Sequence, residues 1–169
     1  MRTGFVFGFV GLGAFAAAAV GNTTPIGVFG GSTYFTSDAA VTITEARALA
    51  DDLGGHVVSI NTEDEQVWLN SVVGFTERFW IGLSDEQVEG EFVWDSGEVF
   101  DYSYWNSGEP NDQVPGEDFV WLNWNQTNGR WNDVQIGADP VRAIIEVVPA
   151  PGSIALLGAA GFVVGRRRR

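Results

Sequence analysis

The most informative stretch of this chain is Glu109-Pro110-Asn111-Asp112, which is followed by Glu117-Asp118 and by Trp131-Asn132-Asp133. Carboxylates and carboxamides stand on both sides of a proline, and the second acidic pair begins eight residues after Glu109. Such side chains offer only oxygen ligands, of which Ca²⁺ takes about six to eight. The chain has no cysteine and a single histidine, which disfavours zinc and redox metals. Ligand type and spacing therefore predict a calcium site.

Two helices are predicted upstream of this stretch. Thr42-Ile43-Thr44-Glu45 fits a capping box, apolar residues recur at helical spacing as far as Leu53, and Gly54-Gly55 ends the helix. Thr62-Glu63-Asp64-Glu65 is a second capping box. The apolar face of the second helix is expected at Val67, Trp68, Leu69 and Val72.

The rest of the chain reads as strands and loops. Short apolar or alternating runs predict strands at 56–60, 79–83, 91–94, 119–122 and 143–147. Residues 95–118 are polar and show little periodicity, and a loop of this length in a compact domain is usually functional or disordered. Its acidic residues and its three aromatic residues between 102 and 105 favour a loop ordered by metal.

Both ends of the chain are typical of targeting segments. Met1-Arg2, the apolar residues 5–20 and small residues at the cleavage position predict a signal peptide at 1–21. Residues 22–30 are expected to form a short linker. At the other end, residues 149–153 precede an apolar run at 154–165 and the block Arg166–Arg169. This run is shorter than the roughly 20 residues of a membrane-spanning helix.

The segment 149–169 resembles the PEP-CTERM sorting signals of bacteria, which exosortases process. The chain has Pro149-Ala150-Pro151 where that family usually has Pro-Glu-Pro. The resemblance implies export, transient membrane association through this segment, and processing to a secreted, cell-surface or extracellular-matrix protein. A plain C-terminal membrane tail is the alternative.

Charge excludes one large class of partner. The chain has 9 basic and 22 acidic residues, and removing both ends leaves four Arg against all 22 acids, a net charge of −18. Nucleic acid binding requires a basic surface, so no nucleic acid partner is expected. A neutral polyhydroxyl partner with cations is compatible with this charge. Without cysteine, the exported domain must depend on core packing and bound metal, and the seven Trp and many of the twelve Phe of the chain lie between the two ends.

Over residues 31–148 the chain resembles C-type lectin domains. The resemblance implies an α+β fold in which two helices flank small antiparallel sheets and a long loop region binds calcium. Each motif is weak alone, but the ordered set is highly specific: Thr44-Glu45-Ala46, Gly54-Gly55-His56-Val57-Val58-Ser59-Ile60, Trp80-Ile81-Gly82-Leu83, Gly90-Glu91-Phe92-Val93-Trp94, Trp105, Glu109-Pro110-Asn111, Gly116-Glu117-Asp118 and Trp131-Asn132-Asp133.

The resemblance also implies site residues. The principal calcium ligands would be Glu109, Asn111, Glu117, Asn132 and Asp133. An auxiliary calcium site would use Asp85, Glu89, Asp112, Glu117 and Asp118.

A calcium ion held in this way binds two vicinal sugar hydroxyls, which donate to carboxylates and accept from carboxamides. The order Glu-Pro-Asn, rather than Gln-Pro-Asp, resembles that of binders of mannose, glucose, N-acetylglucosamine or fucose. Pro110 is expected to be cis, since only an X-Pro bond adopts that form at low energy. Shallow sugar contacts predict weak monovalent binding, about millimolar, with avidity from several copies in an oligomer.

Two departures from the family pattern stand out. The positions of its two usual disulfides are here Ala50 with Ile145 and Phe119 with Ile136, which predicts that buried apolar pairs replace the bridges. The segment 123–129 is longer than usual and adds Trp124 beside the expected sugar surface. Trp124 is a candidate for stacking on sugar, although a loop tryptophan that packs against the domain is equally compatible.

The sequence leaves two non-enzymatic functions open. The first is a lectin for surface or matrix polysaccharide, and the second is an adhesion module in which calcium orders the loops and the partner is a protein. Trp131 is expected in the core and His56 in a structural role. Glu109 and Glu117 resemble the acid pair of a glycosidase, but metal binding also explains the neighbouring Asn and Asp residues. No enzymatic activity is predicted.

Overall fold

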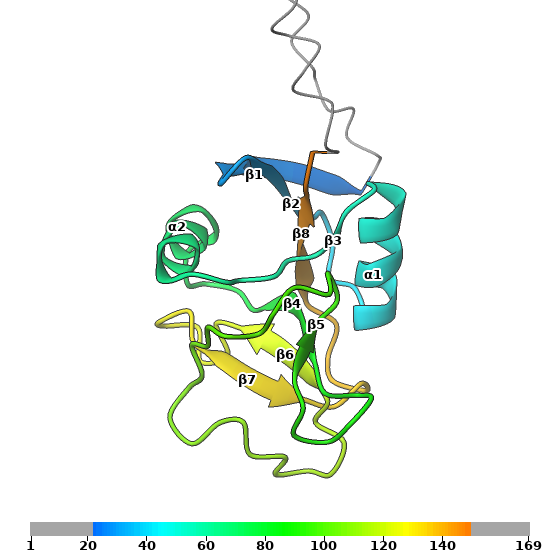
Figure 1. The fold of residues 1–169 in the computed structure, drawn as a ribbon, viewed down its shortest axis with the longest axis vertical. Coiled ribbons are helices and arrows are strands. Elements are labelled where there is room, and N and C mark those ends of the chain that lie inside the picture. The colour runs from blue at the N-terminus through cyan, green and yellow to red at the C-terminus, as the bar shows by residue number, and fades with distance from the viewer. Residues whose placement is uncertain (1–21, 150–169) are drawn as a thin grey trace, which may run out of the picture.

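The computed structural model describes residues 22–149. The predicted signal peptide and all but the first residue of the predicted sorting segment lie outside this range. Within it, neither helix is long and apolar enough to cross a membrane. The described ends of the chain lie at the same end of the molecule, beside β1 and β8 (Figure 1).

Two helices and eight strands make up the domain (Figure 1). In the main sheet the strand order is β1-β2-β8-β4-β6-β7, with β3 paired to β8 and β5 paired to β4. The pairing of β4 with β8 is parallel, so the sheet is mixed, whereas antiparallel sheets were expected. The elements are β1 Thr23–Phe29, β2 Ser32–Ser37, α1 Ile43–Asp52, β3 His56–Val57, α2 Glu63–Val73, β4 Phe79–Ser84, β5 Val93–Trp94, β6 Phe119–Leu122, β7 Trp131–Val134 and β8 Arg142–Val147.

The linker expected at 22–30 is wrong, because most of it forms β1. This strand pairs antiparallel with β2, and a bulge between Pro25 and Gly27 interrupts the register. The Pro and Gly residues obscure the strand signal in the sequence, because both are typical of turns. β1 is nevertheless an edge strand, the position in a sheet at which Pro is tolerated.

Capping explains where both helices begin. Thr42 and Glu45 form the predicted capping box at α1, with Thr42 accepting from the Glu45 backbone N–H and Glu45 accepting from the Thr42 backbone N–H. At α2, Thr62 accepts from the Glu65 backbone N–H. The Glu65 side chain does not close the box, since its Oε2 accepts from the Asn61 backbone N–H at 3.0 Å.

The buried face of α2 is partly polar, which corrects the predicted apolar face. Leu69 is buried as expected, but Val67 and Val72 are 59% and 39% exposed. Glu65 and Gln66 occupy the inner positions instead. Their hydrogen bonds to other side chains permit this burial and connect α2 to the rest of the core.

The core consists of two clusters of buried residues. One is centred on Leu69, Leu83 and Trp131, and the other packs beneath α1 around Trp80 and Ile145. Gly82 lies where β4 approaches β3, because a Cβ at this position would lie 2.3 Å from the Val57 carbonyl oxygen. The two helices flank β2 and β8, while β6, β7 and the long loop lie at the other end (Figure 1).

The two apolar pairs that were predicted to replace disulfides behave differently. Ala50 and Ile145 are 1% and 0% exposed and share one buried cluster, as predicted for an apolar replacement. Phe119 is buried, but Ile136 is 61% exposed, so the second predicted pair is wrong. Phe119 is instead opposite Val134 in the β6–β7 ladder.

Candidate functional site

The loop that carries Glu109 is anchored to β7. The backbone N–H groups of Asn111 and Asp112 both donate to Oδ2 of Asp133, at 2.9 Å each. The Glu109–Pro110 peptide bond is cis, as predicted. One carboxylate of a buried strand therefore fixes the backbone of the loop next to the other expected ligands.

Trp131, the first residue of β7, anchors this strand in the core. Its side chain is 0% exposed, and its indole Nε1–H donates to the Gln66 carboxamide at 2.8 Å. The rings of Trp94, Tyr102 and Trp105 surround it at centroid distances of 5.8, 6.0 and 5.8 Å. The predicted core role is confirmed, and it connects the site rigidly to α2.

The five predicted principal ligands come from the loop and from β7. Asn132 and Asp133 are 7% and 1% exposed, whereas Glu109 and Asn111 lie at the surface. The Asn111 amide donates to the Glu109 carboxylate. Desolvation raises the pKa of Glu109, and the nearby carboxylates of Asp133 and Glu117 raise it further. Three acids therefore repel one another beside two carboxamides.

The predicted auxiliary ligands form a second acidic group beside the first. Desolvation followed by the charges of Asp112, Asp85 and Asp118 raises the pKa of Glu89. The pKa of Asp118 is raised by desolvation and then by Asp85 and Asp112. Oδ1 of Asp112 accepts from the backbone N–H groups of Gly116 and Glu117 at 2.9 and 3.2 Å, which fixes the turn between the two groups.

Two buried carboxylate oxygens in these groups lack a partner. Asp133 and Asp85 are 1% and 3% exposed, and Oδ1 of each makes no hydrogen bond. Within residues 22–149, no three His, Asp or Glu side chains converge as a finished metal cage. The unpartnered oxygens, the mutual repulsion and the all-oxygen donor set nevertheless fit a hard cation such as Ca²⁺.

Trp124, the predicted sugar-stacking residue, is half-buried and packs against the domain. Its ring stacks on Trp121 at 5.6 Å with an interplanar angle of 28°. Its loop is held by Asn123, which is fully buried and accepts from the Gly129 backbone N–H at 3.1 Å. Arg78 lies over the Trp124 ring at 4.4 Å. Arg78 immediately precedes a buried strand, and nothing in the sequence pattern marks it as a partner of Trp124.

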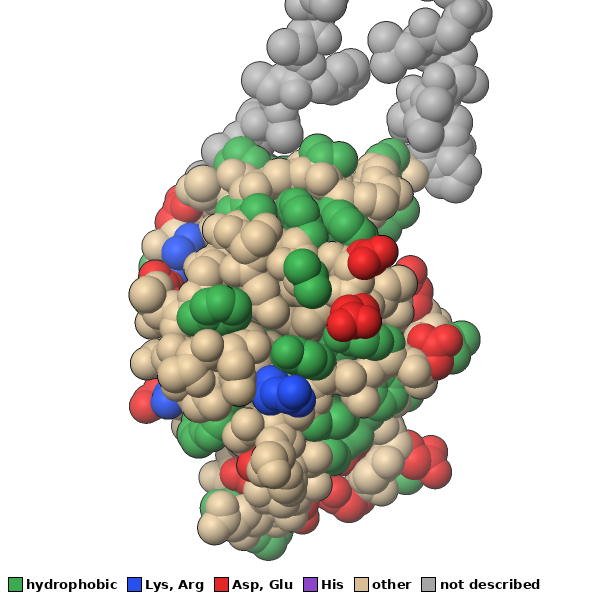
Figure 2. Space-filling model, turned by 90° about the vertical axis from the view of Figure 1, so that its left-hand side faces the viewer, with side chains coloured by type: hydrophobic (Ala, Val, Ile, Leu, Met, Phe, Trp, Pro, Cys, Tyr) green, Lys and Arg blue, Asp and Glu red, His purple; other side chains and the backbone are tan. Residues whose placement is uncertain are grey.

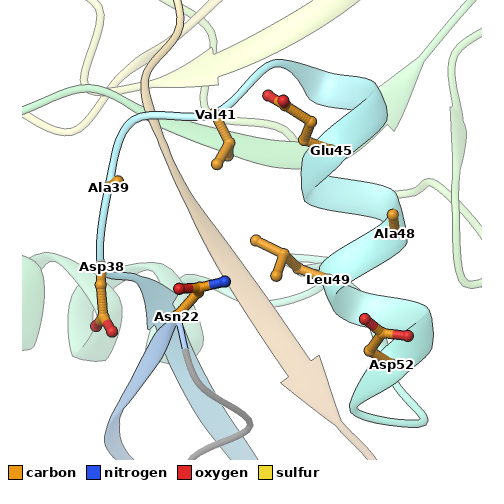
Figure 3. A pocket seen from close by; sticks show the side chains of 8 residues that line it. All are labelled: Asn22, Asp38, Ala39, Val41, Glu45, Ala48, Leu49 and Asp52. Carbon is orange, nitrogen blue, oxygen red and sulfur yellow. The ribbon is translucent and has the colours of Figure 1, made fainter.

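A pocket separate from the predicted ligands lies between α1 and the segment that precedes it. Its volume is about 440 Å³, and Val41 and Leu49 point into it (Figure 3). Asp38, Glu45 and Asp52 stand apart around its rim and do not converge on a common point (Figure 3). The pocket shares no residue with the predicted ligands, and its geometry provides no acid–base pair.

On the α2 side, hydrophobic side chains lie in separate patches rather than in one continuous surface (Figure 2). Acidic side chains are concentrated toward one edge of this face (Figure 2). The negative charge of this face is therefore unevenly distributed (Figure 2).

Comparison with known proteins identifies the family. The model of the Lectin C-type domain family matches residues 39–137. The mouse low affinity immunoglobulin epsilon Fc receptor is 44% identical over 89 residues, which cover 53% of this chain and 26% of the receptor. Mouse C-type lectin domain family 4 member E is 34% identical over 125 residues, covering 70% of this chain and 58% of that protein. This chain therefore spans less than two thirds of either relative.

Among solved structures, the carbohydrate-recognition domain of cow CD23, determined in the presence of a GlcNAc2Man3 oligosaccharide, is similar. It superposes with a TM-score of 0.65 and 33% sequence identity, covering 72% of this chain and 91% of that domain. The family model covers more than half of the chain, and the predicted α+β C-type lectin fold is confirmed. The chain belongs to the C-type lectin domain family.

Proposed function

We propose that this domain is an exported lectin that binds carbohydrate through Ca²⁺ at Glu109, Asn111, Glu117, Asn132 and Asp133. The observation that carries the proposal is the buried Asp133 carboxylate, which anchors the loop through Oδ2 while Oδ1 has no partner. A buried charge without a partner is costly, so an oxygen-seeking cation is its natural complement.

Different side chains of the site would donate hydrogen bonds to the sugar and accept them from it. When bound, Ca²⁺ supplies coordination positions that vicinal hydroxyls can fill. Glu109 and Glu117 accept hydrogen bonds from those hydroxyls, and Asn111 and Asn132 donate to them. The existing contact between the Asn111 amide and the Glu109 carboxylate supports this role, because it places donor and acceptor side by side.

The sugar class that we infer is of the mannose or glucose type. The order Glu109-Pro110-Asn111 supports it, and the similar cow CD23 domain was solved with an oligosaccharide that contains mannose and N-acetylglucosamine. Glu109 and Asn111 lie at the surface, so we expect shallow sugar contacts, with affinity of about millimolar for a single site and avidity from an oligomer.

A second calcium ion is proposed at Asp85, Glu89, Asp112 and Asp118. The unpartnered Oδ1 of Asp85 supports this site in the same way as that of Asp133 supports the first. Asp85 also accepts from the Gly90 backbone N–H at 2.8 Å, so the ion would join the 85–90 turn to the long loop. Its role would be to order the loops and not to bind sugar directly.

We propose that the protein is exported, on the basis of the sequences at the two ends of the chain. A signal peptide at 1–21 and a sorting segment at 149–169 would place the mature domain outside the cell, after transient membrane association and processing. Of the relatives, one is named as a receptor and another as a member of a C-type lectin domain family.

A calcium-stabilised adhesion module is the second candidate. It is favoured by apolar side chains around the long loop, since Val93, Val99 and Val114 are 50%, 77% and 47% exposed. Exposed apolar residues near a binding loop suit a protein partner better than a sugar hydroxyl.

Retention on immobilised mannose tests the proposal. We expect the purified protein to be retained in calcium and released by a chelator, with galactose beads as the matched control. Retention that survives the chelator would contradict the role of calcium. Flow-through on mannose, glucose, N-acetylglucosamine and fucose alike would favour the adhesion module.

A further inference from the structure

Arg47 on α1 lies at the place where the long loop begins and ends. Its guanidinium donates to Asp95, the first residue of the 95–118 loop, and its guanidinium carbon lies 5.4 Å from the ring centroid of Phe119, which directly follows that loop. It also pairs with Glu86 in the turn at 85–90. One helical side chain therefore connects this turn with both ends of the long loop.

The contacts of Arg47 use the planar fork of its guanidinium group. Nε and Nη2 donate to the two carboxylate oxygens of Asp95 at 3.0 and 2.7 Å, which makes a bidentate pair. Nη2 also lies 2.8 Å from Oε1 of Glu86 and donates to Oγ of Ser84 at 3.4 Å. A lysine ammonium is a point charge and does not reproduce this arrangement.

The ion pairs of Arg47 are partly shielded from water. The side chains of Arg47, Glu86 and Asp95 are 31%, 30% and 17% exposed. The Phe119 ring below the guanidinium is buried in the core and gives it a fixed platform. A bidentate network of this kind holds its members in place better than an isolated ion pair on an open surface.

The partners of Arg47 adjoin the proposed ligands of the second calcium site. Glu86 follows Asp85, and Phe119 follows Asp118. The Asp85 backbone N–H donates to the Asp118 carbonyl oxygen at 3.1 Å, which joins the turn directly to the end of the loop. Fixing the turn and the loop ends through Arg47 therefore places these two carboxylates beside each other.

The charges of the acids oppose this arrangement. Desolvation raises the pKa of Asp118, and the charges of Asp85 and Asp112 raise it further. Glu86 adds an effect of the same sign. Of the three ion pairs within residues 22–149, the two made by Arg47 lie in this region. Arg47 thus supplies a fixed cation among acids that repel one another.

We propose that Arg47 is a positioning residue for the second calcium site: it fixes the 85–90 turn and both ends of the long loop so that the ligands are held together before the ion binds. This inference rests on the proposed second site and identifies what pre-organises it. Ligands that are already ordered lose less entropy on binding, which raises affinity. Helix α1, which carries no proposed ligand, thereby becomes part of the calcium-binding structure.

The charge of Arg47 acts in the opposite direction to its positioning role. A cation near the site repels Ca²⁺, and without it Glu86 and Asp95 would attract the ion. A purely electrostatic role therefore predicts tighter calcium binding after Arg47→Gln, whereas the positioning role predicts weaker binding. Positioning should prevail, because Glu86 and Asp95, at 2.8 and 2.7 Å, already balance the Arg47 charge.

Calcium titration calorimetry on the full-length protein provides the test, with Ca²⁺ alone as the probe. The parent should bind two ions, and the ion that Asp85→Asn removes defines the second site. Arg47→Gln should weaken binding at this site about tenfold, and Arg47→Lys, which keeps the charge without the fork, about threefold. The ion that Asp133→Asn removes should keep its affinity within about twofold.

Arg142→Gln is the matched control. Like Arg47, Arg142 pairs with an acid and lies over an aromatic ring, in this case Glu77 at 3.6 Å and Phe79 at 5.8 Å. Its hydrogen bonds go to Thr36 and Ser37 on β2. Both calcium affinities should therefore stay within about twofold of the parent.

Hydrogen exchange in chelator tests the same role without calcium. The backbone N–H groups of Asp85, Val88 and Gly90 are hydrogen-bonded in the turn or to the loop end. Arg47→Gln should speed their exchange about tenfold, because the turn is then no longer held against α1. The N–H groups of Asn111 and Asp112, which donate to Asp133, should exchange as in the parent.

The outcomes separate this inference from the function on which it rests. Weaker binding confined to the second site, together with faster exchange of the turn, would establish the positioning role. Tighter or unchanged binding in Arg47→Gln, equal weakening in Arg142→Gln, or unchanged exchange of the turn would each overturn it and leave the two calcium sites intact. A parent that binds only one ion would contradict the second calcium site itself, and the inference would fall with it.

Discussion

Two buried carboxylates, Glu65 on α2 and Asp133 on β7, differ in how their oxygens are hydrogen-bonded. Both oxygens of Glu65 accept a hydrogen bond, from the Tyr34 hydroxyl at 2.7 Å and from the Asn61 backbone N–H at 3.0 Å. Asp133 is more deeply buried, yet only its Oδ2 has partners. Glu65 is therefore complete within the protein, and Asp133 is not.

This difference separates a structural acid from a ligand-binding one. Burial and charge alone do not make the distinction, because both residues are buried acids beside other acids. The distinguishing feature is an oxygen that the fold leaves without a donor. Asp85 belongs with Asp133 by this criterion, since its Oδ1 is also unpartnered.

The largest effect is expected from Asp133→Asn. Asparagine retains one oxygen for the backbone N–H groups of Asn111 and Asp112 but loses the charge and the second oxygen. Calcium affinity should fall at least about a hundredfold, because changing residues that only orient metal ligands already costs about tenfold to hundredfold, and mannose retention should be lost. Calcium titration calorimetry measures the first effect. Thermal unfolding in chelator should change little, and unchanged calcium affinity would contradict the proposed ligand role.

The next largest effect is expected from a double variant that exchanges a donor and an acceptor without changing the net charge. The double variant Glu109→Gln, Asn111→Asp keeps oxygen ligands at both positions, so calcium should still bind. Mannose affinity should fall at least about tenfold, because the hydroxyls then meet the wrong partners on each side. Calorimetry with mannose and calcium measures both affinities. Equal mannose affinity in parent and variant would show that these side chains do not set the specificity.

Local signals in the sequence were sufficient to predict the two helices and the acidic loop. Thr42 and Glu45 form the predicted capping box, and the Glu109–Pro110 peptide bond is cis, as predicted. These features depend on neighbours in the chain, so a short motif carries them. The helix and strand signals together with the ordered motifs were sufficient to predict the fold.

Features that depend on distant contacts were not predictable. Gln66 on α2 is buried because it accepts from the Trp131 indole, 65 residues away. The β1 strand exists because β2 provides its partners, although Pro25 and Gly27 suggest a turn. Ile136 was expected to pair with Phe119 but is exposed, because Val134 is opposite Phe119 instead. In each case a tertiary contact overrides the local pattern.

Glu65→Ala should show the opposite behaviour to Asp133→Asn. Removing the Glu65 carboxylate leaves the Asn61 N–H without its acceptor and leaves the Tyr34 hydroxyl only the longer contact to Glu146 at 3.2 Å. This loss should cost about 2 kcal/mol of unfolding free energy. Urea unfolding measures this loss, and Glu65→Gln, which retains an acceptor, is the control. Calcium and mannose affinities should remain within about twofold of the parent. A loss of calcium affinity in Glu65→Ala would break the distinction drawn between the two acids.

Asp85→Asn should give a smaller effect than Asp133→Asn. It neutralises the second unpartnered carboxylate and leaves the principal ligands unchanged, so the number of bound calcium ions should fall by one. Mannose affinity at saturating calcium should fall about threefold or less, because Asp85 orders the loop without touching sugar. Calorimetric stoichiometry measures the first effect. Complete loss of mannose binding would place Asp85 among the principal ligands instead.

The smallest expected effect is on the pH dependence of stability, whose sign should change when calcium binds. Desolvation is the largest cause of the raised pKa of Glu65, Glu89, Glu109 and Asp118 in the folded protein. A group of this kind stabilises the fold fully below its unfolded pKa and loses that contribution as pH rises through the folded pKa. In chelator, acidification from neutral pH toward the ordinary Glu value of 4.5 should therefore raise stability. Glu45, whose pKa is lowered by the Thr42 backbone N–H, opposes this trend.

With calcium bound, the slope should reverse, because the ligands must be deprotonated and acidification displaces the ion. Thermal unfolding at about pH 7 and about pH 5, with calcium or with chelator, measures the four midpoints. Asp133→Asn should behave in calcium as the parent does in chelator, since it has lost the principal ion. Slopes of the same sign in both conditions would mean that the acids of the loop do not hold calcium, and the contrast between Glu65 and Asp133 would then be one of packing alone.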